Sequence, residues 1–365
     1  MPTTTLPDYS GGSLVNLMAE LEHRMTGSSP SPRLHTGIAD LVPGADTYVL
    51  VLFDGLGASQ LDHQVAGPLR ESLATTIDAP FPSTTTVSLA TVATGLPASQ
   101  HGILGYQLWM PELDVVANTI HWTTLWGDAL DIDAGALLPH PNLWQRLTDH
   151  NIEPITVQPT NFQGSSLSQA LYRGCRFEGI TTLDELVTAT VDLAAQPGRL
   201  IFTYFPNVDF AAHVYGQESD EYGAALAAAA LVWEQIGLRL PQGAVAVGTA
   251  DHGHVDFAAD RRIKIPKGDH DDREFYGDGR AMFVKGDGAA LAETLPATWI
   301  PIDRCRHWWG PGPMSETAEK RLPDGILLAD DDHVLLHRFS DDRMIGNHGA
   351  LTDAERTIPL LVTPG

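Results

Sequence analysis

Three short segments of the sequence carry side chains suited to binding divalent metal ions. Asp209 and His213, in YFPNVDFAAHVYG, are four residues apart, so one helical turn would place both on the same side. Asp251 and His252, in GTADHGH, are adjacent, and His348, in GNHGALTDAE, lies beside a glycine that permits close backbone approach. Mixed carboxylate and imidazole ligands suit Zn²⁺, with Mn²⁺ or Fe²⁺ as the next candidates. Each motif alone is weak, because such pairs also occur on ordinary surfaces.

A cluster of hydroxyl side chains supplies a candidate nucleophile. Ser83, Thr84, Thr85 and Thr86 open a helical segment, VSLATVAT, that ends at Gly95, a common helix terminator. Backbone N–H groups at the start of a helix stabilise anions there. A hydroxyl remains a poor nucleophile unless a base or a metal ion holds it as the alkoxide. An ordinary helix cap is the alternative interpretation.

Three buried parallel strands would bring the acidic members of these motifs together. Apolar, β-rich runs at 47–53, 200–205 and 244–250 lead into Asp54, Asp209 and Asp251 respectively. In open α/β sheets, ligands bind beyond the carboxyl ends of the strands. We therefore expect the three carboxylates to converge.

Helical patterns separate these strands, the clearest at 221–240 and 141–150, with a short strand at 155–157. This alternation predicts an α/β fold with a mostly parallel sheet sandwiched between helices. Residues 254–345 are richer in Asp, Gly and Pro, and short alternating runs at 281–284, 325–328 and 333–336 suggest hairpins. We expect a core at 1–253, a smaller inserted cap at 254–345, and a return to the core at 346–365.

The composition disfavours several classes of partner. The chain has 365 residues, with 22 basic and 46 acidic side chains and a net charge of −24. Such a chain is a poor partner for a nucleic-acid polymer or an anionic bilayer. It has two cysteines, and no run approaches the roughly 18 apolar residues of a membrane span. We expect a cytoplasmic protein, with a secreted protein that has lost its signal segment as the alternative; no oligomeric state is predicted.

Taken in order, five segments resemble the alkaline phosphatase superfamily, specifically its type I phosphodiesterase and nucleotide pyrophosphatase branch. They are FDGLG, PSTTT with ATGLPASQHGILGY, YFPNVDFAAHVYG, TADHGH and NHGALTDAE. The resemblance covers about residues 45–110 and 198–254 and the stretch from Gly346. It implies an alkaline-phosphatase-like sheet, two divalent metal ions, most suitably Zn²⁺ with Mn²⁺ as the alternative, and a small phosphate ester, such as a nucleotide, as substrate.

The resemblance also implies a role for individual residues. One metal ion would be bound by Asp54, Asp251, His252 and the nucleophile, and the other by Asp209, His213 and His348. The family's nucleophile lies ten residues before the glycine that ends its helix, which selects Thr85. The implied reaction is an in-line displacement at phosphorus through a phosphothreonine-type intermediate.

Two departures leave the substrate class open. Diesterase members often carry an asparagine that grips a phosphoryl oxygen, and at that spacing this chain has Ser88. Monoesterase members use an arginine, and this helix contains none. A phosphodiesterase or nucleotide pyrophosphatase is the leading hypothesis, and a phosphomonoesterase or phosphonate hydrolase is the alternative. A third hypothesis, from a different functional class, is a protein that binds metal or phosphate without catalysis.

Several other residues have two interpretations. His254 would either support the neighbouring ligands or be an ordinary loop histidine, and His337 is interpreted as a surface or cap histidine. Trp308 and Trp309 would pack in the core or stack on a leaving group.

Overall fold

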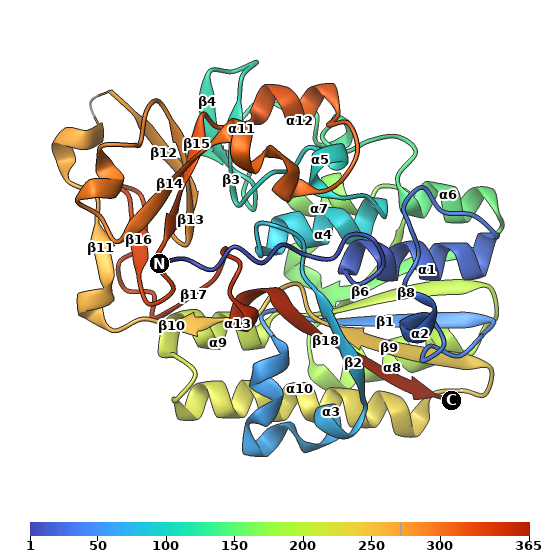
Figure 1. The fold of residues 1–365 in the computed structure, drawn as a ribbon. Helices are drawn as coiled ribbons and strands as arrows, with labels where there is room; N and C mark the ends of the chain where they lie inside the picture. Colours follow the sequence, from blue (N-terminus) through green and yellow to red (C-terminus); the bar gives the residue numbers. More distant parts are fainter. Residues whose placement is uncertain (271) are drawn as a thin grey trace.

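The computed structural model describes residues 1–270 and 272–365. Its centre is a seven-stranded sheet in the order β2-β18-β9-β1-β8-β6-β7 (Figure 1). The parallel strands are β1 (Thr47–Phe53), β6 (Glu153–Pro159), β7 (Arg176–Ile180), β8 (Arg199–Phe205) and β9 (Ala244–Thr249). The antiparallel edge consists of β2 (Leu73–Asp78) and β18 (Thr357–Pro364). The predicted α/β class with a mostly parallel sheet is confirmed.

The predicted apolar runs form the middle of this sheet because each is buried on both faces. All seven residues of β1 are buried, as are all six of β9. Phe53 pairs with Phe205, and Leu52 pairs with Thr249, so the three strands end at the same level. This register brings the residues that follow them to one edge of the sheet.

Helices cover both faces of the sheet (Figure 1). One side carries α1 (Leu14–Thr26), α4 (Thr85–Thr94), α6 (Leu143–Asp149) and α7 (Ser166–Leu171); the other carries α3 (Gly67–Glu71), α8 (Leu183–Ala194) and α10 (Asp220–Arg239). In α10 the buried residues include Leu226, Ala229, Ala230, Trp233 and Ile236, a stripe of helical period facing the sheet. The helices predicted at 221–240 and 141–150 therefore form, with ends shifted by one or two residues.

Smaller sheets lie at the carboxyl end of the central sheet. A four-stranded antiparallel sheet contains β12 (Glu274–Asp278), β13 (Ala281–Lys285), β15 (Gly325–Ala329) and β14 (Ala297–Pro301). Two pairs join β10 (Val255–Asp256) to β17 (Gly346–Asn347) and β11 (Arg262–Lys264) to β16 (Val334–Leu336). A three-stranded sheet of β3 (Gln107–Met110), β4 (Val115–Asn118) and β5 (Thr123–Thr124) packs beside β12. No sequence pattern predicted this last sheet, whose strands have at most four residues.

The two short runs near residue 330 do not form a hairpin with each other. β15 pairs with β13 and β14, whereas β16 runs parallel to β11. The buried Arg280 side chain lies between them and donates to the backbone carbonyls of Asp330 (2.8 Å) and His333. These hydrogen bonds satisfy two carbonyls of the turn, which are then not available for pairing between the two strands.

Short helices complete the chain: α2 (Thr36–Ala39), α5 (Ala98–His101), α9 (Asn207–Tyr215), α11 (Ile302–Cys305), α12 (Glu316–Arg321) and α13 (Asp353–Arg356). Within the described ranges, every helix is too short or too polar to cross a lipid bilayer.

Candidate metal centre

The carboxyl edge of the central sheet gathers the predicted acidic residues. Asp54 directly follows β1, Asp251 follows β9, and Asp209 lies in the first turn of α9 after β8. Gly55 has a φ of +74°, and a Cβ atom there would lie 2.8 Å from the Asp209 Cα. Glycine is therefore needed at this turn, both for its backbone conformation and for the close approach of α9.

Asp54, Asp251 and His252 form the first donor group. Their donor atoms all lie within 4.8 Å of one another, and all three residues are buried. The His252 Nε2 atom is 3.6 Å from Asp54 Oδ1 and 3.5 Å from Asp251 Oδ2. Burial, followed by the charges of Asp251 and Asp209, raises the pKa of the Asp54 carboxyl. Two buried carboxylates this close strongly favour a cation between them.

Each carboxylate of the first group is held through one oxygen and presents the other. Tyr204 donates its hydroxyl to Asp54 Oδ2, while the backbone N–H groups of Gly55 (3.0 Å) and His252 (3.1 Å) donate to Asp251 Oδ1. Asp54 Oδ1 and Asp251 Oδ2 are buried and have no hydrogen-bond partner among the described residues. Unsatisfied buried oxygens are costly, so these two atoms fit a bound metal ion.

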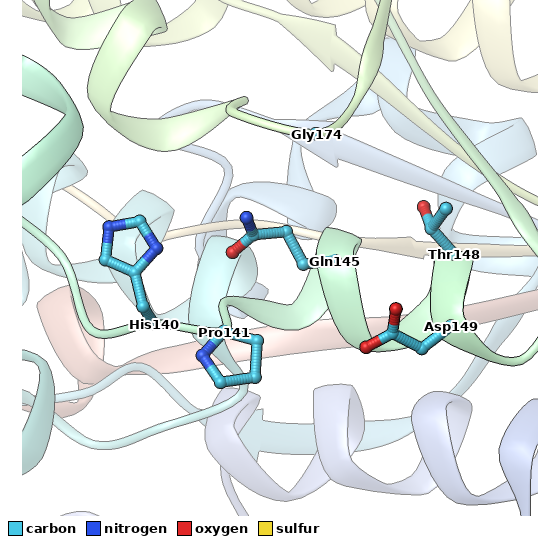
Figure 2. Close-up of a pocket in the computed structure, with 6 residues that line it drawn as sticks. All are labelled: His140, Pro141, Gln145, Thr148, Asp149 and Gly174. Atoms are coloured by element: carbon cyan, nitrogen blue, oxygen red, sulfur yellow. The ribbon is translucent and has the colours of Figure 1, made fainter.

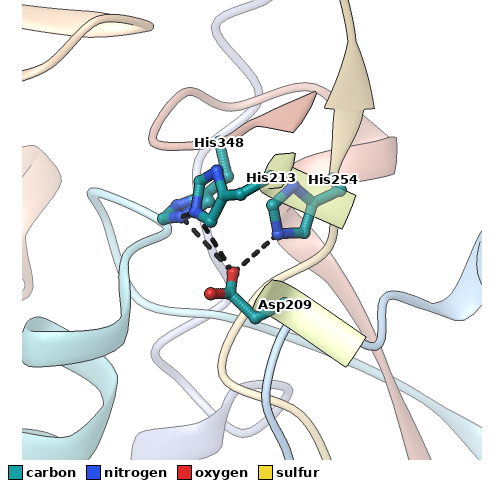
Figure 3. Close-up of side chains that lie close together, drawn as sticks. All are labelled: Asp209, His213, His254 and His348. Atoms are coloured by element: carbon teal, nitrogen blue, oxygen red, sulfur yellow. Dashed lines mark hydrogen bonds and ion pairs between the residues drawn. The ribbon is translucent and has the colours of Figure 1, made fainter. Parts of the chain in front are cut away.

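Asp209, His213, His254 and His348 form the second donor group, whose side chains point toward one another in Figure 3. The Asp209 Oδ1 atom is 3.4 Å from the Nε2 atom of His213 and 3.8 Å from that of His348. These two Nε2 atoms are 3.2 Å apart. The spacing suits a set of ligands around one ion.

Backbone carbonyls orient the imidazoles of both groups. His213 Nδ1 lies 2.7 Å from the Gly346 carbonyl, His348 Nδ1 2.8 Å from the Ser83 carbonyl, and His252 Nδ1 3.1 Å from the Gly253 carbonyl. A carbonyl can only accept, so each Nδ1 carries the proton. The Nε2 lone pairs are then left free to bind a metal ion.

The threonines at the start of α4 have different contacts. The Thr85 hydroxyl lies 3.1 Å from His252 Nε2. Thr84 instead donates to Asp278 (3.3 Å), and Thr86 donates to the Gly105 carbonyl (3.3 Å). Of these three hydroxyls, the one on Thr85 faces the first donor group, as the nucleophile should.

Ser88 points away from the site. Its hydroxyl is fully buried and donates to the backbone carbonyl of Asp251 at 2.8 Å. Ser88 therefore fastens α4 to the end of β9, and its side chain is not placed to grip a phosphoryl oxygen.

A cavity of about 290 Å³ opens beside the second donor group and is lined in part by Thr85, Asp209, His213 and His348. Its other walls come from the small sheets and their loops, including Tyr106, Asp278 and His337. Burial raises the pKa of the Asp278 carboxyl to about 7 and lowers that of His337 to about 4. His337, interpreted from the sequence as a surface or cap histidine, is thus a buried residue of this wall.

A second cavity, of about 360 Å³, lies beside α6 and contains none of the donor groups (Figure 2).

Trp308 and Trp309 pack in the core, since both lie edge-on against the buried Phe81, at 5.2 and 5.3 Å between ring centroids. Neither lines the cavity beside Thr85.

Sequence reasoning did not assign a role to Asp278, Tyr204 or Arg280, and it left His254 undecided. The fully buried Arg280 binds Glu355 through two contacts of 3.1 Å. Proximity to the ligand pair in TADHGH was the one signal for His254. Asp278, Tyr204 and Arg280 each bond to a residue that is 75 to 194 positions away in the chain. No spacing in the sequence therefore pointed to them.

A family match identifies the family of the chain, and similar solved structures share its fold. Residues 48–351 match the family described as type I phosphodiesterase / nucleotide pyrophosphatase. Murine ectonucleotide pyrophosphatase/phosphodiesterase 5 has a similar structure, with a TM-score of 0.67 and 16% identity over 87% of this chain and 88% of that chain. An inactive variant of that murine protein, in complex with AMP, has a TM-score of 0.68 and 16% identity over 87% of each chain.

Phosphonoacetate hydrolase from Sinorhizobium meliloti, in complex with phosphonoformate, gives a TM-score of 0.65 and 18% identity over 88% of this chain and 90% of that chain. No curated protein sequence matches the chain.

Proposed function

The chain belongs to the type I phosphodiesterase/nucleotide pyrophosphatase family and is a phosphoric ester hydrolase, and on that premise we propose that it cleaves phosphodiesters with Thr85 as nucleophile. The observation that carries the proposal is the position of the Thr85 hydroxyl, 3.1 Å from His252 in the first donor group. That hydroxyl also faces the cavity that the second donor group lines.

Two divalent metal ions fit the two donor groups. Asp54, Asp251, His252 and Thr85 would hold one, and Asp209, His213 and His348 the other. The orphaned oxygens of Asp54 and Asp251 and the free Nε2 atoms support this set, and its mixture of oxygen and nitrogen donors favours Zn²⁺, with Mn²⁺ as the alternative. When bound, such ions lower the pKa of a hydroxyl and stabilise negative charge on phosphoryl and leaving oxygens.

Thr85 supplies the covalent step. Its hydroxyl gives up a proton to solvent, and its Oγ1 atom forms a bond to phosphorus while the bond from phosphorus to the leaving alkoxide breaks; the alkoxide takes up a proton from solvent as it leaves. Water then attacks phosphorus, the bond from phosphorus to Oγ1 breaks, one proton of the water restores the Thr85 hydroxyl, and a phosphomonoester leaves. The first backbone N–H groups of α4 lie beside this atom and stabilise the charge that develops on the phosphoryl oxygens.

The charge of the cavity favours a diester over a monoester. Among the described residues that line it there is no lysine or arginine. A phosphodiester carries one negative charge at pH 7, whereas a monoester approaches two and needs more positive charge around it. The murine relative binds AMP and the Sinorhizobium hydrolase binds phosphonoformate, so small ligands of this kind fit sites on this fold.

The test compares substrates and two threonine variants. Metal-loaded protein should hydrolyse bis(p-nitrophenyl) phosphate faster than p-nitrophenyl phosphate or phosphonoacetate, and chelation should abolish the activity. Thr85→Ala should lose about a thousandfold or more in kcat. Thr94→Ala is the matched control, because Thr94 is the last residue of α4, at the opposite end from Thr85. Its hydroxyl donates to the Ala90 carbonyl (2.7 Å) and accepts from the Leu96 backbone N–H (3.2 Å), so both of its contacts are local.

Two results would contradict the proposal. An active Thr85→Ala protein would exclude this nucleophile. Two bound metal ions per chain without turnover of any ester would identify a binding protein without catalysis.

A further inference from the structure

The cavity beside Thr85 has a wall that the hydrolytic chemistry does not use. Asp278, at the end of β12, lines it and is only 9% exposed. Its Oδ1 atom accepts a hydrogen bond from Thr84, while its Oδ2 atom is buried with no hydrogen-bond partner among the described residues. A buried carboxylate without a cationic partner is costly and favours a ligand that supplies positive charge.

Asp278 lies between two segments of the proposed catalytic site. Thr84, which bonds to it, immediately precedes the proposed nucleophile. Gly349, which follows His348, packs against its other side, since a Cβ atom on that glycine would come within 2.6 Å of the Asp278 Cβ. Asp278 is thus enclosed between the segments that carry Thr85 and His348.

The rest of the wall has the composition of a site for an organic cation. Tyr106 contributes an aromatic ring, and Phe339, Ile120 and Met344 contribute apolar side chains. Aromatic rings bind alkylammonium groups through cation–π attraction. The Tyr106 hydroxyl accepts a hydrogen bond from Asn118 at 2.9 Å, which fixes its position at the wall.

Cationic side chains near this wall are already paired and lie outside the lining. Arg343 binds Asp341, a second carboxylate of the cavity, at 2.6 Å. Arg338 stacks on Phe339, 4.9 Å from the ring centroid, and approaches Glu274 at 3.5 Å. Asp278 has no such partner, and the chain as a whole carries a net charge of −24, which attracts cations and repels anions.

We propose that this wall, formed by Asp278 and Tyr106, is a subsite for a positively charged alkylammonium group on the substrate. The proposal rests on the proposed function and deepens it: the substrates are phosphodiesters of a small amino alcohol. The cavity volume of about 290 Å³ suits such a compact substituent. Polyphosphate and carboxylate substituents are disfavoured by the same wall.

The test uses three p-nitrophenyl diesters that share a leaving group and differ in the second substituent, which is choline, ethyl or carboxymethyl. Metal-loaded protein should favour the choline diester over the ethyl diester by about tenfold in kcat/KM, with the carboxymethyl diester slowest. In Asp278→Asn the choline-to-ethyl ratio should fall toward one. Tyr106→Leu should also reduce it, whereas Tyr106→Phe, which keeps the ring, should not.

Asp342→Asn is the matched control, because Asp342 lies in the same loop as Asp341 but outside the cavity, bound to Lys264 at 2.5 Å. This variant should keep the parent ratio. A parent ratio near one, or a ratio unchanged in Asp278→Asn, overturns the subsite while hydrolysis of the ethyl diester still supports the proposed function. If no diester is cleaved, calorimetric titration with tetramethylammonium decides the subsite alone: binding that Asp278→Asn abolishes supports it, and no binding to the parent overturns it.

Discussion

The Asp209 Oδ1 atom lies 2.7 Å from His254 Nε2, closer than it lies to His213 or His348. This is hydrogen-bond distance, and the His254 side chain is fully buried. In Figure 3 the three imidazoles converge on the same Asp209 oxygen, and the His254 ring lies 4.7 Å from the His213 ring and 5.0 Å from the His348 ring, between centroids. We infer that His254 donates a hydrogen bond to Asp209 and fixes the direction in which its oxygen points.

His254→Ala should therefore weaken the second metal site more than the first. Loss of a hydrogen bond to a ligand commonly lowers metal affinity by about 10- to 100-fold. The measurement is a chelator-competition titration that resolves the two metal equivalents. His254→Gln should recover part of the affinity, because its side-chain amide can donate to the same carboxylate. Equal loss at both sites would point to a general folding defect instead.

The buried ion pair between Arg280 and Glu355 should stabilise the joint between the small sheets and the core. Glu355 also accepts hydrogen bonds from the backbone of Ala350 (3.0 Å) and from Thr352 (2.6 Å), so it organises the segment after His348. Glu355→Gln leaves the guanidinium buried without its counter-charge and should cost about 3–5 kcal/mol in the free energy of unfolding. Urea denaturation of the metal-free protein measures this cost.

Glu316→Gln is the control for that experiment. Glu316 forms an exposed ion pair with Lys320, and such pairs contribute little to stability. Its variant should unfold at the parent urea concentration. A Glu355→Gln protein that did the same would show that the buried pair contributes nothing.

Ser88→Ala separates an anchoring role from a role in substrate binding. The lost hydrogen bond to the Asp251 carbonyl should reduce the free energy of unfolding by about 1 kcal/mol. If Ser88 only joins α4 to β9, kcat/KM for a diester should stay within about threefold of the parent. A loss of about a hundredfold, with both metal ions still bound, would show that Ser88 contacts the phosphoryl group after all.

The parts of the fold that could be predicted from sequence are those that local pattern determines. The run TYVLVLF is buried at every position, so its apolar residues alone predict a central strand. Asp54 and Asp251 could be placed at one edge because residues that follow parallel strands share that edge. Thr85 required the family resemblance, since Thr84 and Thr86 have the same chemistry and differ only in what they face.

The remaining features depend on contacts between distant segments. Asp278 meets Thr84 across 194 residues, and Arg280 meets Glu355 across 75. The turn at 330–333 has the local pattern of a hairpin, but Arg280 binds its carbonyls and β16 pairs with β11 instead. No periodicity records such pairings, because each is selected by the packing of the whole chain.

The carboxyl of Asp278 should make stability depend on pH in the opposite direction from an ordinary surface aspartate. Burial raises its pKa from an ordinary value of 3.8 to about 7, so the folded protein binds a proton that the unfolded chain releases. Its titration does not change the free energy of unfolding below about pH 4. As pH rises toward 7, it lowers that free energy by at most roughly 1.4 kcal/mol per pH unit. Asp278→Asn removes this titration. The free energy of unfolding of the variant relative to the parent, measured in urea without metal or substrate, should therefore rise between pH 4 and pH 7. A difference that stays constant over this range would mean that Asp278 keeps its charge in the folded protein.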